Sequence, residues 1–168
     1  MEERNQFSEE KYLDFNRLLD QYRTKNVPPW VLRERAFFAS LNFRKGINWH
    51  SHSALLAIRV QEDKCWIANE NLANEIYDPF VLSDIRGFDR AKLYLEARVE
   101  ELAKEYWESS YSLGDYLNLE LENLKNYDEE VLIFHDIEPK DIQCLMVITD
   151  HKKFTPESWQ KHYANLLL

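Results

Sequence analysis

The chain has 168 residues, of which 45% are hydrophobic and 14% aromatic, and its formal net charge is −9. This composition argues against a disordered chain and gives enough apolar surface for one domain with a core. The acidic balance disfavours a protein that grips nucleic acid through its phosphates, because such binding needs a basic face. No apolar run approaches the length of a membrane span, and the acidic residues 1–5 are not typical of a signal peptide, so we expect a cytoplasmic protein with no membrane association.

The first predicted element is a helix over residues 8–24. Ser8 is placed to cap it, and Tyr12, Phe15 and Leu19 fall on one apolar face. Pro28 and the proline that follows it prevent the helix from continuing.

The middle of the chain alternates short apolar runs with longer amphipathic ones. We expect buried strands over 35–40 and 54–60, separated by a polar loop. The span 64–77 is expected to change from strand to helix and to be broken at Pro79. A helix over 90–108, capped by Asp89, is followed by a short helix over 116–124.

Two further strands are predicted near the C-terminus, one beginning at Glu130 and one over 142–148, and we expect them to be neighbours in a sheet. A last helix, 154–166, has Thr155 as its N-cap and a proline at its first position. Strands in separate blocks with helices between them predict a single α+β domain over 1–168, whose 33–148 core holds a split mixed or antiparallel sheet with flanking helices.

Glu130 is the most informative residue in this pattern. A carboxylate at the head of an apolar strand is costly unless another group pairs or uses it. The alternation of the strand leaves two registers open, and we favour the one in which Glu130 shares a face with Leu132 and Phe134 rather than the one that turns Val131 and Ile133 inward.

Three other groups of residues have a functional and a structural interpretation. His50 and His52 resemble a metal-binding pair, but without a third ligand at familiar spacing a surface loop is favoured. Cys65 and Cys144 lie in apolar runs, which favours buried free thiols over nucleophiles or a disulfide. Trp107 lies off the core stripe of its helix, so its indole either packs in the core or stacks on a planar ligand.

Three segments together resemble the ADP-ribosyltransferase fold, in particular its divergent DarT-type toxins. Residues 130–133 (EVLI) and 137–142 (IEPKDI) resemble the catalytic-glutamate strand and its continuation. Residues 35–40 (RAFFAS), followed by a loop and the strand 54–60, resemble the strands that flank the nicotinamide pocket. Residues 103–107 (AKEYW) resemble a helix end seen upstream of that glutamate.

This resemblance implies an effector or toxin that cleaves NAD, as its substrate, at the nicotinamide–ribose bond and transfers ADP-ribose to a macromolecule. Glu130 would then be the catalytic carboxylate that stabilises the oxocarbenium-like state. Arg35, Ser40, His50, His52 and Trp107 would hold NAD. The N-terminal motif with which these families grip NAD is missing before Arg35, so that grip is either rebuilt from other residues or lost.

Two other functions stay open on the residues themselves. An acidic, aromatic-rich chain without an NAD-gripping motif fits a non-catalytic immunity, inhibitor or adaptor module whose partner is a protein. The four cations of residues 33–45 alone suggest an enzyme that processes RNA or phosphate, which is the least supported of the three.

Overall fold

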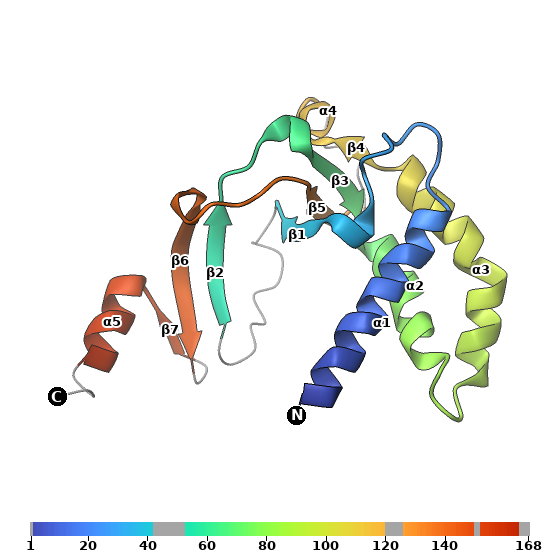
Figure 1. Cartoon of the computed structure of the whole chain (residues 1–168), viewed down its shortest axis with the longest axis horizontal. Coiled ribbons are helices and arrows are strands. Elements are labelled where there is room, and N and C mark those ends of the chain that lie inside the picture. Colours follow the sequence, from blue (N-terminus) through green and yellow to red (C-terminus); the bar gives the residue numbers. More distant parts are fainter. Residues whose placement is uncertain (1, 42–52, 120–125, 150–151, 165–168) are drawn as a thin grey trace. The chain divides into compact units, whose positions relative to one another are not determined.

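The computed structural model describes residues 2–41, 53–119, 126–149 and 152–164. Its contacts divide the chain into two compact units. Unit 1 comprises residues 1–41 and 62–134, and unit 2 comprises residues 42–61 and 135–168. Among the described residues, five α-helices accompany two antiparallel sheets, one in each unit (Figure 1). The predicted α+β class with antiparallel pairing is therefore confirmed, whereas the single-domain boundary stays a prediction.

Unit 1 is built on a four-stranded sheet in the order β1-β5-β3-β4. Its strands are β1 (Phe37–Ser40), β3 (Cys65–Asn69), β4 (Tyr111–Ser112) and β5 (Glu129–Ile133). β5 lies between β1 and β3 and pairs with both in antiparallel register. Because both of its edges are used, β5 has no place for β6, and the prediction that these two strands are neighbours is wrong.

Three helices of unit 1 cover one face of this sheet. They are α1 (Glu2–Gln21), α2 (Glu70–Leu82) and α3 (Asp89–Glu108). The short α4 (Leu113–Leu117) is not among them, since its Tyr116 donates to Glu129, which is on the opposite face of β5 from Glu130. α1, α2 and α3 lie side by side in Figure 1 and share a core with the sheet. That core includes the following buried residues: Phe15, Leu19, Ile76, Leu102, Tyr106, Trp107, Trp66 and Leu132. The face of the sheet that carries Leu132 is therefore the one that packs against the helices.

Several predicted helix boundaries are wrong. α1 begins at Glu2 instead of Ser8, since residues 2–7 contain neither proline nor glycine, and it ends at Gln21. α2 continues through Pro79, because packing of its last turns against α3 compensates for the single backbone hydrogen bond that proline removes. Phe88, not Asp89, is the N-cap residue of α3.

The remaining element of that region is also shorter than predicted. The helix expected over 116–124 is observed as α4, which ends at Leu117, and residues 120–125 lie outside the described chain.

Unit 2 contains a three-stranded antiparallel sheet in the order β2-β6-β7 and one helix. The strands are β2 (Ser53–Ile58), β6 (Ile142–Thr149) and β7 (Lys152–Phe154), and the helix is α5 (Pro156–Ala164). The Ser158 amide donates to the Thr155 hydroxyl oxygen over 3.2 Å, which confirms Thr155 as the helix cap. The predicted end of this helix, residues 165–166, lies outside the described chain.

Candidate functional site

Glu130 lies at the head of β5, inside unit 1, where it is 7% exposed. It is on the same face of β5 as Leu132, which is fully buried in the core, and Phe134, which packs against that core. Val131 and Ile133, on the opposite face of β5, are 4% and 1% exposed. Both faces of the strand are therefore buried, and the choice between the two predicted registers stays a prediction. Burial of a carboxylate at this position requires a partner, and unit 1 supplies two.

The first partner is Arg33, which is 1% exposed and lies on a 3-10 turn, Arg33–Arg35, just before β1. Its Nη1 donates to Glu130 Oε1, and its Nη2 donates to Glu130 Oε2 over 3.0 Å. The two charged groups therefore meet in the two-pronged geometry that suits a guanidinium and a carboxylate.

The second partner is Tyr106 of α3, whose hydroxyl donates to Glu130 Oε1 over 2.8 Å and also receives a hydrogen bond from Arg33 Nη1. The remaining Arg33 nitrogen, Nε, donates over 3.1 Å to the buried amide oxygen of Asn16 in α1. Arg33, Glu130, Tyr106 and Asn16, which we call the buried cluster, thus connect α1, the 3-10 turn, α3 and β5.

Aromatic rings complete the surroundings of Arg33. The guanidinium carbon lies 4.8 Å from the ring centroid of Phe38, 5.0 Å from that of Tyr106 and 5.6 Å from that of Phe15. These distances are within the range of cation–π attraction. The charge of Arg33 is therefore compensated both by a carboxylate and by ring faces.

Electrostatics in the buried cluster favour the charged arginine. Burial by itself lowers the pKa of Arg33, but Tyr106 and Glu130 outweigh it and the pKa is raised. Burial also raises the pKa of the Tyr106 hydroxyl well above its usual value, so this group stays a neutral donor. Both oxygens of Glu130 are thus occupied by hydrogen bonds from permanent donors.

This arrangement limits what Glu130 can do chemically. A carboxylate that stabilises a developing cation on a substrate needs an oxygen directed at that substrate. Here each oxygen already accepts from Arg33, and one accepts from Tyr106 as well. Among the described residues, Oε2 accepts from Arg33 alone, so a ligand would have to approach this one oxygen of a residue that is 7% exposed.

The other predicted site residues are dispersed. Ser40 is directly opposite Glu130 in the pairing of β1 with β5, so the structure brings these two residues together. Arg35 is exposed, two residues from the buried Arg33. His50 and His52 lie outside the described residues.

Trp107 packs in the core rather than beside a pocket. It is 1% exposed, and its Nε1 donates to the backbone carbonyl of Leu19 over 2.8 Å. The core alternative for this residue is confirmed, and its predicted contact with a planar ligand is wrong, because the indole is surrounded by protein.

Sequence reasoning identified the need for a partner of Glu130 but missed which residues provide it. Arg33 enters the sequence analysis only as one of the four cations of residues 33–45, and Tyr106 only within the segment 103–107. The available signal was the arginine itself, a charged residue between Val31 and the apolar run that begins at Ala36.

Among the described residues, no group of three or more His, Cys, Asp or Glu side chains is arranged to hold a metal ion. Within the same part of the chain, none of the helices combines the length and apolar character needed to cross a bilayer. Comparisons with family models, curated proteins and solved structures gave no significant match to this chain. The resemblance to ADP-ribosyltransferases therefore stays a prediction.

Proposed function

We propose that the protein is a non-catalytic interaction module that binds a basic protein partner through unit 1. The observation that carries this proposal is the distribution of charge between the units. Unit 1 has 25 Asp and Glu residues against 14 Lys and Arg residues, an acidic excess of 11, whereas unit 2 has 5 against 7. The acidic excess of the whole chain therefore belongs to unit 1.

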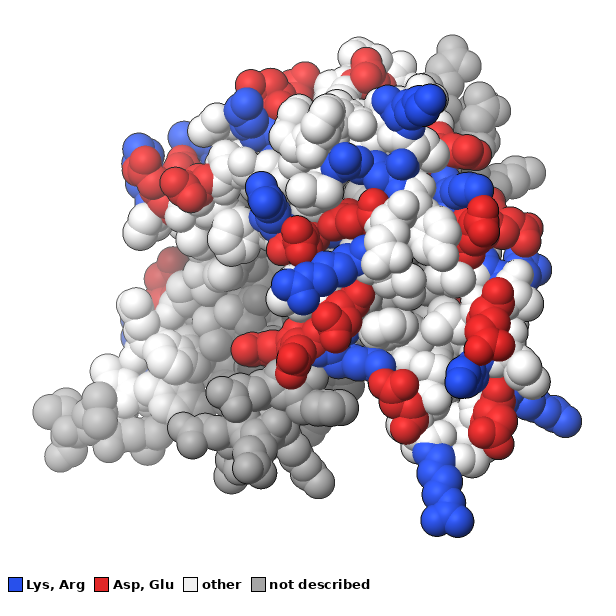
Figure 2. Space-filling view, turned by 45° about the vertical axis from the view of Figure 1, so that its right-hand side comes forward, with Lys and Arg blue, Asp and Glu red and all other residues white. Residues whose placement is uncertain are grey.

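The buried cluster bears on this proposal because it contains both an acid and a base. Among the described residues of unit 1, Glu130 is the one acid that is buried, and it is neutralised by Arg33, so this pair adds nothing to the acidic excess. On the face shown in Figure 2, acidic and basic side chains are intermixed rather than gathered in one patch. The attraction to a basic partner therefore comes from the net acidic excess of unit 1 and not from a single acidic patch. It speeds the encounter, while other contacts provide specificity.

The proposal is tested with a cationic peptide as the probe. Fluorescein-labelled nona-arginine is titrated with the full chain, and binding is measured by fluorescence anisotropy at rising salt concentration. We expect binding at low salt that weakens steadily as salt is added, because ions screen exposed charges beyond about 8 Å at physiological ionic strength. An uncharged glycine–serine peptide of equal length is the control. Failure of nona-arginine to bind at low salt would contradict the proposal.

ADP-ribosyl transfer is the second candidate function, and the pairing of Ser40 opposite Glu130 favours it. In that mechanism, Arg33 leaves Glu130 when NAD binds, and the freed carboxylate stabilises the oxocarbenium-like state. The candidate is tested by the change in melting temperature with millimolar NAD, since a ligand of the folded state raises that temperature. An increase that is lost in Glu130→Gln would favour transfer over the interaction module.

A further inference from the structure

Trp30 is a large aromatic residue on the surface of unit 1. It is 43% exposed, although the next residue in the chain, Val31, is fully buried in the core. Tryptophan is among the residues that contribute most to binding energy when they lie at protein interfaces. An exposed tryptophan alone is common, so the case for a function depends on how this one is held.

The backbone on both sides of Trp30 is fixed by one guanidinium. Arg23 Nη1 donates to the carbonyl of Pro29 over 3.1 Å and to the carbonyl of Val31 over 2.9 Å. The Val31 amide in turn donates to the carbonyl of Pro28 over 3.0 Å, which closes a turn around the tryptophan. Two prolines further restrict this segment, and Val31 itself is fully buried.

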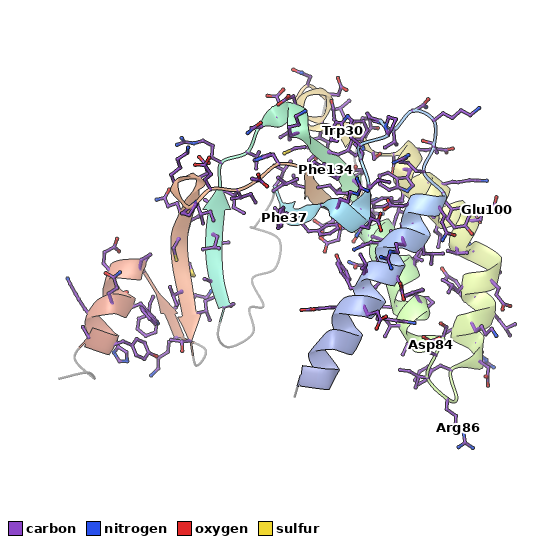
Figure 3. The ribbon with its side chains drawn as sticks, in the orientation of Figure 1. Trp30, Phe37, Asp84, Arg86, Glu100 and Phe134 are labelled. Atoms are coloured by element: carbon purple, nitrogen blue, oxygen red, sulfur yellow. The ribbon has the colours of Figure 1, made fainter. Side chains whose placement is uncertain are left out.

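The indole is also held from beneath by other rings. Its centroid lies 5.2 Å from that of Phe134 and 6.3 Å from that of Trp66, in both cases with the rings nearly perpendicular. Figure 3 shows Trp30 and Phe134 close together. A side chain fixed in this way loses little conformational freedom on binding, which is the condition under which a contact contributes most to affinity.

A cation already lies near this ring. The Nζ of Lys64 is 5.9 Å from the indole centroid, at the outer limit of a cation–π contact. Lys64 is exposed, so a better-placed cation from a partner can replace it. Among aromatic side chains, tryptophan provides the most favourable face for arginine or lysine.

We propose that Trp30 is the anchor of the surface through which unit 1 binds its basic partner, and that the partner places an arginine or lysine side chain on the exposed indole. This inference rests on the proposed function. It adds a specific contact to the general attraction, because the acidic excess of unit 1 draws a basic segment toward the surface and the fixed indole selects its cationic side chain.

The test compares three variants of the full chain in the nona-arginine titration. Trp30→Ala removes the ring, and Trp30→Phe keeps a smaller one. Leu93→Ala is the matched control, because Leu93 is 64% exposed, is also in unit 1 and lies outside the aromatic group. We expect Trp30→Ala to weaken binding by about 5- to 30-fold, Trp30→Phe to recover part of that loss, and Leu93→Ala to change it by less than about twofold. The melting temperature of each variant is measured first.

The outcomes separate this inference from the proposed function. If the parent chain does not bind nona-arginine, the proposed function fails. If the parent binds and Trp30→Ala and Leu93→Ala bind equally well, only the anchor role of Trp30 is overturned. If Trp30→Ala does not fold, the test rests on Trp30→Phe. If Trp30→Phe then binds nona-arginine as tightly as the parent does, the cation–π contact is overturned.

Discussion

The buried pair of Arg33 and Glu130 makes a quantitative prediction about stability. Glu130→Gln keeps the shape of the side chain but leaves the charge of Arg33, at 1% exposure, without its carboxylate. Removing one partner of a buried ion pair lowers the free energy of unfolding by about 3–5 kcal/mol, because the other charge is left buried without compensation. Replacing both partners with apolar side chains costs much less. The amide that replaces one oxygen also brings a donor toward Arg33 or Tyr106, each of which donates to Glu130 in the parent.

We therefore expect Glu130→Gln to lower the free energy of unfolding by about 3 kcal/mol. For a chain of this size, each kcal/mol corresponds to roughly 2–4 °C, so the melting temperature would fall by roughly 6–12 °C. The assay is urea and thermal unfolding followed by circular dichroism. Glu100→Gln is the control, since Glu100 forms an exposed pair with Lys104 on α3, and it should leave stability close to that of the parent.

A double-mutant cycle with Arg33→Met checks that the two residues act on each other. Removing both charges should cost about 1–3 kcal/mol less than the sum of the two single substitutions, because neither charge is then left unpaired. If Glu130→Gln were as stable as the parent, or if the two effects simply added, the reasoning about this pair would be refuted.

Three further predictions concern other parts of the chain. Trp107→Phe should reduce the free energy of unfolding by about 2 kcal/mol, because it deletes a buried hydrogen bond to the backbone of α1 and leaves a cavity; unchanged stability in urea unfolding would argue against the core position. Thr155→Ala should cost about 1 kcal/mol through loss of the α5 cap, seen as faster amide exchange in that helix, and unchanged exchange would contradict it. Burial, followed by the charge of Asp63, raises the pKa of the Cys65 thiol to about 11. Iodoacetamide at pH 8 should therefore modify Cys144 well before Cys65, and equal rates in the two single Cys→Ser variants would refute this.

The raised pKa of Cys65 also has a consequence for stability. Because the thiol is favoured in the folded state, its contribution is fully present below the pKa of the unfolded chain and is lost as pH rises toward about 11. We expect the melting temperature of the parent to decline over this range more than that of Cys65→Ser.

Much of the fold followed from patterns that are local in the sequence. The strand at Glu130 and the cap of α5 were predicted correctly, because strand propensity and capping depend on residues within a few positions of one another. Both faces of that strand are buried, so its alternation does not select an inward face. The pairing of strands was not. β5 and β6 are consecutive apolar runs joined by a short connection, yet they belong to different sheets. Which strand edges meet is decided by contacts between distant residues, and periodicity contains no information about them.

The candidate site was predicted in the same uneven way. The cost of burying a carboxylate showed that Glu130 needed a partner, and Arg33 is 97 positions away in the sequence. Resemblance to a catalytic strand suggested a substrate as that partner, whereas the structure provides a guanidinium and a phenol. Composition alone does not show that Arg33 is buried and Arg35 exposed. The two arginines are two residues apart, and the 3-10 turn directs the first inward and leaves the second outside.

The most direct test of the proposed function is a single thermal-shift experiment on the parent chain with two ligands, millimolar NAD and nona-arginine at low salt. A ligand that binds the folded state must raise the melting temperature once it exceeds its dissociation constant. The interaction module predicts an increase with nona-arginine and none with NAD. An increase with NAD and none with nona-arginine would contradict it and return Glu130 to a catalytic role.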